Sequence, residues 1–167
     1  MSKRIVLLQA LAAAVSNVRL LLQDIDQGSW EHRLSPNEWS MADVLGHLIA
    51  VEVRFWQRLQ RVLAEERPFL PLILPDETTH NLSASVADFA EVRQKTLAFL
   101  RDVADEEWGR TAVHETQGEV SFHNLVQYLV DHDSEHLNQI AAIQQQLKTT
   151  PDRKPQPAIS ESETSFN

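Results

Sequence analysis

Hydrophobic residues recur at every third or fourth position in four long stretches of the 167-residue chain. This spacing places apolar side chains along one face of an α-helix, whereas a half-buried strand shows strict alternation. The pattern predicts helices at residues 3–23, 40–65, 85–104 and 121–147, with residue 83 as an alternative start of the third. Four amphipathic helices must bury their apolar faces against one another, so we expect an all-α fold, a four-helix bundle.

The first predicted helix carries an apolar stripe and has polar residues on its other faces. We expect these side chains to face the core: Ile5, Leu8, Ala12, Val15, Leu22 and Ile25. The same segment has the basic start, apolar run and small residues of a secretory signal, which is the alternative interpretation. The periodicity continues past any cleavage point, which favours a core helix. No apolar stretch approaches the roughly 20 residues that span a bilayer, so no membrane segment is expected.

The connection between the second and third helices is long. Residues 67–82 read "RPFLPLILPDETTHNL", and Pro68, Pro71 and Pro75 interrupt any helical periodicity. A segment of this length can extend up to about 50 Å, enough to return along a whole helix and begin a parallel neighbour. We therefore expect a crossover between these helices. A short extended hairpin is expected around Gly118.

The chain is expected to form one domain with a tail. Residues 1–147 contain all of the helical pattern and form the predicted bundle. Residues 148–167, "KTTPDRKPQPAISESETSFN", lack hydrophobic periodicity and are rich in proline, serine and glutamate. Such a composition cannot bury enough apolar surface to fold, so the tail is predicted to be disordered.

Composition excludes several classes of function. The net charge of −9 does not favour nucleic acid or anionic membranes as partners. The absence of cysteine excludes disulfides, cysteine-ligated zinc and a protein thiol nucleophile. The few glycines form no phosphate-binding loop. We expect a cytoplasmic protein with a small-molecule substrate.

Two histidines interrupt the apolar stripe of the fourth helix. His132 and His136 are four residues apart, so both side chains leave the same helix face. Two buried imidazoles without partners would be costly, and one shared divalent cation would remove the cost. His47 faces inward from the second helix, beside Leu48 and Val51, and is the best candidate for a third ligand. The alternative is that all three are hydrogen-bonded core residues of an interaction module.

Two segments resemble a known family. "SPNEWSMADVLGHLIAVEVRFWQRL" is similar to the P-x-x-W-S…H-L signature of the DinB/YfiT-like superfamily, and "VSFHNLVQYLVDHDSEHLNQI" to its H-x-x-x-H-x-x-Q-I signature. The resemblance covers about residues 5–147. It implies an up-down-down-up bundle, a homodimer, and a metal site whose ligands are His47, His132 and His136.

Three histidines leave a divalent metal with at least one open position, as in catalytic sites. The ion could activate water or hold a thiolate. The resemblance implies both chemistries, because some members of the family look like hydrolases and others like thiol-dependent transferases. Because the chain has no cysteine, the thiol would be a low-molecular-weight co-substrate. We expect a metal-dependent hydrolase or thiol S-transferase; the alternative is a non-catalytic metal- or ligand-binding stress-related protein. Zinc or nickel is expected first, and manganese or iron would also suit imidazole ligands. No catalytic residue is assigned.

Nearby polar residues could support such a site. Gln139 lies on the same helix face as His136 and could bind a ligand or substrate. Asp43 could orient His47, although a capping box with Ser40 already explains it. The remaining acidic residues of the fourth helix are expected on a solvated face: Asp131, Asp133 and Glu135. The four tryptophans are interpreted as packing residues, with a substrate cleft as the alternative.

Overall fold

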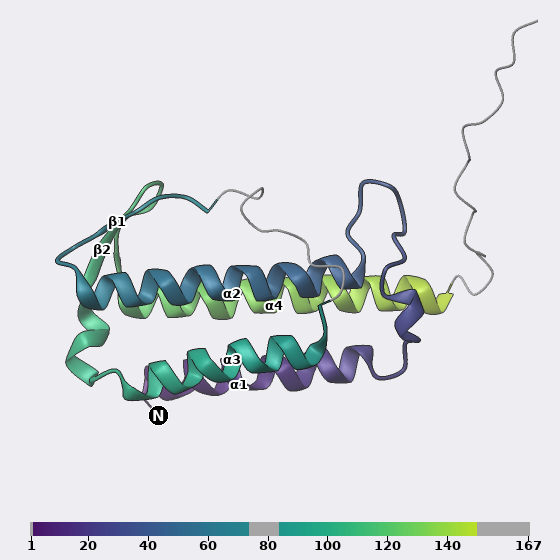
Figure 1. Ribbon diagram of the computed structural model, residues 1–167, viewed down its shortest axis with the longest axis horizontal. Coiled ribbons are helices and arrows are strands. Elements are labelled where there is room, and N and C mark those ends of the chain that lie inside the picture. Colours follow the sequence, from purple (N-terminus) through teal and green to yellow (C-terminus); the bar gives the residue numbers. More distant parts are fainter. Residues whose placement is uncertain (1, 74–83, 150–167) are drawn as a thin grey trace, which may run out of the picture.

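The computed structural model describes residues 2–73 and 84–149. Four long helices account for most of this part of the chain (Figure 1). They are α1 (Lys3–Leu22), α2 (Met41–Ala64), α3 (Val86–Asp102) and α4 (Phe122–Thr149). The predicted all-α bundle is confirmed.

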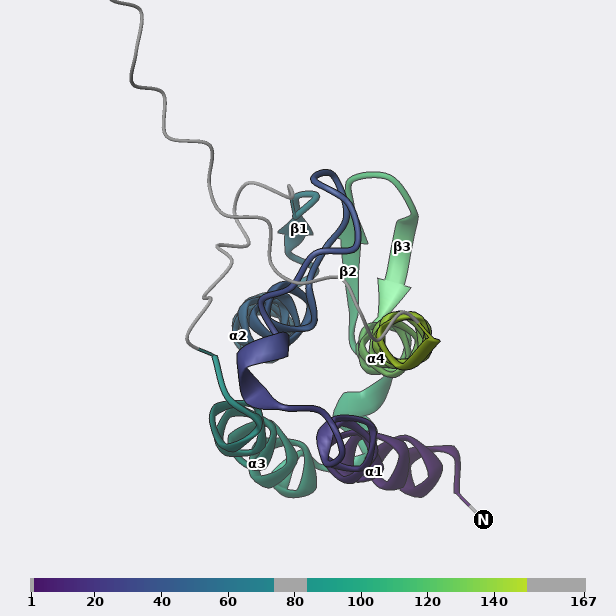
Figure 2. The same cartoon turned by 90° about the vertical axis from the view of Figure 1, so that its right-hand side faces the viewer.

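The helices follow an up-down-down-up course. α1 and α4 run in one direction, and α2 and α3 run in the other (Figure 1). Seen from the end, the four helices stand at the corners of a square, where α1 and α2 each pack against both α3 and α4 (Figure 2). Because α2 and α3 are parallel neighbours, the chain must return along the bundle between them, as the long connection predicted. Residues 74–83 of this connection lie outside the described part.

A small sheet lies beside α2 and α4 near one end of the bundle (Figures 1 and 2). It contains β1 (Phe69–Leu70), β2 (Thr111–His114) and β3 (Gly118–Ser121) in that order. β2 and β3 form the predicted hairpin, in which Gly118 has a φ of +71°, a conformation that favours glycine. β1 pairs in parallel with β2 and was not predicted, because its flanking prolines suggested a loop. Proline is tolerated there because β1 is an edge strand.

The helix boundaries follow local capping chemistry. The Ser40 hydroxyl accepts from the Asp43 N–H, and the Asp43 carboxylate accepts from the Ser40 N–H. Ser85 and Asp88 form the same capping box, which fixes the start of α3 after residue 85. α4 continues through Thr149, so the first two residues of the predicted tail are helical. Residues 150–167 lie outside the described part, and their disorder stays a prediction.

The core has two hydrophobic clusters with a polar layer between them. The cluster near the sheet includes Leu11, Leu59, Leu97, Leu100 and Leu129. The cluster at the other end includes Val18, Leu45, Leu48, Phe89 and Ile140. Between these positions the helices carry buried or half-buried polar residues: Glu52, Arg93, His132, Asp133 and His136. The half-buried His47 lies at the edge of this layer, next to Leu48 of the second cluster. The candidate chemistry therefore lies in the middle of the bundle.

The predicted core stripe of α1 is right in part. The buried residues are Leu7, Leu11, Ala14, Val18 and Leu22. Of the predicted set, Leu22 is buried, and three more are partly buried and pack against the core clusters: Leu8, Val15 and Ile25. Ile5, by contrast, is 46% exposed. The reason is that α1 is apolar on nearly every face, so the three- and four-residue spacing fits more than one stripe.

α1 also corrects the expectation about apolar length. By length and composition alone it could cross a membrane, and among the described helices only α1 meets that criterion. A core helix and an N-terminal signal meet the same criterion. In this fold α1 packs against α3 and α4.

We predict that two leucine-to-alanine substitutions in α1 distinguish its buried face from its exposed face. Leu11 is fully buried, so Leu11→Ala should lower the free energy of unfolding by about 2–5 kcal/mol. Leu20 is 59% exposed, and Leu20→Ala should change it by no more than about 0.5 kcal/mol. Urea unfolding of both variants measures the difference, and equal losses would contradict the observed rotation of α1.

Candidate metal centre

Three histidines from two helices meet in the polar layer. His47 comes from α2, and His132 and His136 come from α4. One possible ligand atom of each lies within 4.8 Å of those of the other two. All three side chains are half-buried. The structure therefore brings together the residues singled out in the sequence as a group that could hold a metal ion.

The spacing of the nitrogens fits a shared ion. His47 Nε2 lies 3.0 Å from His132 Nε2. Two nitrogens that are each about 2.0–2.1 Å from one divalent ion lie about 2.9–3.3 Å apart at ordinary coordination angles. The ring centroids of His136 and the other two imidazoles are 4.7 Å and 4.4 Å apart, so the third ring belongs to the same group.

The protein environment keeps His132 in the neutral form that binds metals. Burial lowers the pKa of His132 to about 3, and the neighbouring His136, His47 and Arg93 add to the effect. A neutral imidazole offers a nitrogen lone pair, which a protonated one does not. His132 is therefore neutral at neutral pH without a metal.

Gln139 fixes the orientation of one imidazole. His136 Nδ1 lies 2.8 Å from Gln139 Oε1. The amide oxygen accepts a hydrogen bond, so Nδ1 carries the proton and Nε2 keeps its lone pair. Histidines that bind metals commonly have such a partner on the other ring nitrogen.

Asp43 lies at the start of the same helix as His47 and is fully buried. Its carboxylate accepts from the Ser40 backbone at 2.8 Å and from Arg33 Nη2 at 3.0 Å. The capping role expected for Asp43 is thus present, together with an ion pair that anchors the loop before α2.

Trp39 is a site residue that the sequence analysis placed among packing residues. Its indole stacks parallel to the His136 ring at 5.9 Å and meets the His47 ring edge-on at 4.8 Å. Trp108 is buried against Phe122, and Trp56 contacts Phe99, as expected of packing residues. The signal for Trp39 was its position directly before the Ser40 cap, which places it at the end of α2 nearest to His47.

A cleft of about 620 Å³ opens beside His136, the member of the histidine group that lines it. The loop before α2 and one face of α4 form its walls, which include Trp39, His136 and Gln139. The cleft gives a small molecule access to the edge of the histidine group.

The sequence profile of the DinB superfamily matches residues 10–140, which is most of the chain and includes all three histidines. The chain belongs to the DinB superfamily. No curated protein sequence gives a significant match to this DinB chain.

Among solved structures, this DinB chain is similar to YfiT from Bacillus subtilis. The two share 20% sequence identity, with a TM-score of 0.73 over 89% of this chain and 90% of YfiT. YfiT is described as a probable metal-dependent hydrolase with an unusual four-helix bundle topology. At this level of identity the likeness establishes the shared fold.

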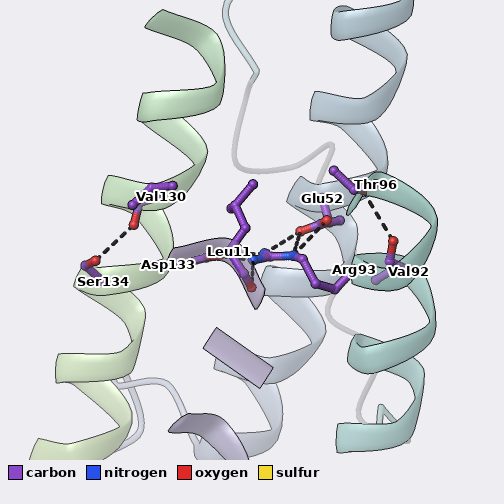
Figure 3. Close-up of polar contacts among 8 residues, drawn as sticks. All are labelled: Leu11, Glu52, Val92, Arg93, Thr96, Val130, Asp133 and Ser134. Carbon is purple, nitrogen blue, oxygen red and sulfur yellow. Dashed lines mark hydrogen bonds and ion pairs between the residues drawn. The ribbon is translucent and has the colours of Figure 1, made fainter. Parts of the chain in front are cut away.

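A buried arginine links all four helices of this DinB protein at the level of the histidines. Arg93 of α3 is 1% exposed. Its guanidinium donates to Glu52 of α2, with Nε 2.9 Å from Oε1, and to Asp133 of α4, with Nη1 2.6 Å from Oδ2 (Figure 3). Nη1 also donates to the carbonyl of Leu11 in α1 at 2.9 Å.

This network overturns the prediction that Asp133 lies on a solvated face. Asp133 is 4% exposed and paired with Arg93, whereas Asp131 and Glu135 are exposed as expected. The sequence carried a signal that was missed, because Leu129, Asp133 and Ile140 also follow helical spacing. Arg93 likewise follows Phe89 by one turn on the buried stripe of α3.

Burial and ion pairing have opposite effects on the pKa values of Arg93 and Asp133. Burial disfavours the charge on Arg93, but the hydrogen bonds that it donates to Asp133 and the charges of Glu52 and Asp133 outweigh this effect and raise the pKa of the guanidinium. Burial raises the pKa of the Asp133 carboxyl, against the opposite effect of Arg93. Arg93 thus stays charged and must keep both carboxylates close. These carboxylates belong to α2 and α4, the helices that carry the histidines.

We predict that Arg93→Met lowers the free energy of unfolding by about 3–5 kcal/mol, because it leaves two buried carboxylates without their cation. The triple variant Glu52→Met/Arg93→Met/Asp133→Leu should recover most of this loss, since it removes all the buried charge. Lys95→Met is the matched control, because Lys95 forms an exposed pair with Glu91 and should change stability by less than about 1 kcal/mol. Urea unfolding provides the values. A single Arg93 variant as stable as the control would refute the role of the network.

We also predict a pH dependence of stability in metal-free protein. The folded-state pKa of His132, about 3, lies below the ordinary value of 6.5. Folded protein therefore binds fewer protons than unfolded protein between these values, and stability is lost as pH falls through that window. The contribution is at most one proton, or about 1.4 kcal/mol per pH unit. Urea unfolding of chelator-treated protein should show that the free energy of unfolding falls less steeply with falling pH in His132→Gln than in the parent. Parallel curves of the free energy against pH would contradict the lowered pKa of His132.

Proposed function

We propose that this DinB protein is a metal-dependent enzyme that activates water or a low-molecular-weight thiol against a small electrophilic substrate. The observation that carries the proposal is the convergence of three imidazoles within 4.8 Å at the edge of a cleft. A closed structural site usually has four protein ligands, and three protein ligands with an adjoining cleft are typical of catalytic sites.

The proposed ligands are His47, His132 and His136, and burial keeps His132 neutral by lowering its pKa. When bound, a divalent ion would supply Lewis acidity, lowering the pKa of water to about 7 or stabilising a thiolate. Gln139 holds His136 in the tautomer that presents Nε2. Trp39 covers one side of the imidazole group and limits its access to water.

The cleft supports a small-molecule substrate. Its volume of about 620 Å³ lies within the usual range for such sites, about 300–1,000 Å³. A thiol would enter as a co-substrate because the chain has no cysteine. We propose zinc or nickel as the ion, since both bind imidazole readily. We also propose that the protein is a homodimer, as the family resemblance implies, and that it is located in the cytoplasm.

We predict that untagged protein binds about one equivalent of zinc or nickel, and that His132→Ala binds less than about a tenth of an equivalent after reconstitution. Elemental analysis after gel filtration provides the values. His123→Ala is the matched control, because His123 lies on α4 beside Trp108 and outside the triad, and it should keep the metal.

Activity separates an enzyme from a metal-binding protein. Metal-loaded parent protein should accelerate either ester hydrolysis or the addition of a small thiol to an aromatic electrophile, and His132→Ala should lose at least about tenfold of that rate. Metal binding with no rate in either assay, or a rate that His132→Ala leaves unchanged, would count against catalysis at this site.

A further inference from the structure

The cleft beside His136 has an uneven charge. Among the residues that the structure describes, its lining contains two carboxylates, Glu38 from the loop before α2 and Glu135 from α4, and neither lysine nor arginine. Both glutamates are exposed, so they stand at the rim. Neither forms an ion pair within residues 2–73 and 84–149.

The rest of the lining is aromatic, aliphatic and amide. Trp39 contributes an indole, Leu34 and Ile143 contribute apolar surface, and Asn37 and Gln146 contribute neutral hydrogen-bonding groups. The indole face attracts cations through its quadrupole, and the carboxylates attract them through their charge. Arg33 of the same loop is paired with Asp43 and is not part of the lining.

These features favour one class of ligand. An amine or quaternary ammonium group would lie against Trp39 between the two carboxylates, and its apolar part would contact Leu34 and Ile143. A ligand with a free carboxylate would meet two negative charges and no cation. The histidine group lies at one wall of the same cleft, so a ligand seated by its cationic end could present its other end there.

We propose that Glu38, Glu135 and Trp39 select an organic cation, and that the substrate or thiol co-substrate of this site carries an ammonium group. The role of the cleft in catalysis rests on the proposed function, but the charge preference is a property of the cleft alone. It is therefore tested on metal-free protein.

The test uses three probes of similar size and different charge: 2-phenylethylammonium, 2-phenylethanol and 3-phenylpropionate. Isothermal titration calorimetry of chelator-treated full-length protein at low salt measures each dissociation constant. Each exposed ion pair contributes a modest free energy, so the cation should bind about five- to tenfold more tightly than the alcohol, and the carboxylate more weakly than both.

Charge-neutral variants assign the effect to the cleft. Glu38→Gln/Glu135→Gln should bring the affinities for the cation and the alcohol within about twofold of each other. Glu106→Gln/Glu107→Gln removes the same charge near the sheet end of the bundle and should leave the preference unchanged. Trp39→Leu should weaken binding of the cation more than binding of the alcohol.

The outcomes are distinguishable. A cation preference that is lost in the cleft variant and kept in the control supports the inference, even if the protein binds no metal and the proposed function fails. The inference is overturned if the cation binds no more tightly than the alcohol. It is also overturned if Glu38→Gln/Glu135→Gln still prefers the cation over the alcohol. Absence of saturable cation binding by about 10 mM also overturns it.

Discussion

The buried guanidinium of Arg93 is the constraint that organises this bundle. A charge in the middle of an apolar core is tolerated only when its hydrogen-bonding groups are satisfied, and here the partners come from the three other helices. The two carboxylates fix α2 and α4 at the same height along the bundle. The hydrophobic clusters at either end then pack around this layer, and local capping boxes set where α2 and α3 begin.

The candidate chemistry of this DinB protein depends on that alignment. Two imidazoles on one helix would bind an ion weakly, and the third has to arrive from a different helix at the correct height and distance. Glu52 is five residues from His47, and Asp133 adjoins His132, so the contacts of Arg93 hold both helices next to the positions that carry the imidazoles. The loop before α2 supplies Trp39, whose ring closes one side of the group and also lines the cleft. Structural and chemical roles thus occupy one layer of the fold.

Much of the fold and of the candidate metal site could be predicted from the sequence, for physical reasons. Four long amphipathic segments specify a bundle, and the length of the connection between α2 and α3 specifies that they are parallel. His132 and His136 were found because polar residues on an apolar stripe are conspicuous. The burial of Asp133 was missed because an acidic residue on a helix is ordinarily expected to be exposed to solvent. The role of Arg93 could be recognised only once its partners Glu52 and Asp133 were known. The core face of α1 was predicted only in part, because apolar residues occur on nearly every face of this helix. The strand β1 depends on pairing with β2, which its own residues do not encode.

The most direct test of the central claim is anomalous scattering from a crystal of zinc-loaded protein. The account predicts one peak about 2.0–2.1 Å from a nitrogen of each of the imidazoles of His47, His132 and His136, with a further coordination position facing the cleft. A peak elsewhere on the protein would contradict the account. So would an ion bound to His132 and His136 with the His47 ring turned away from it.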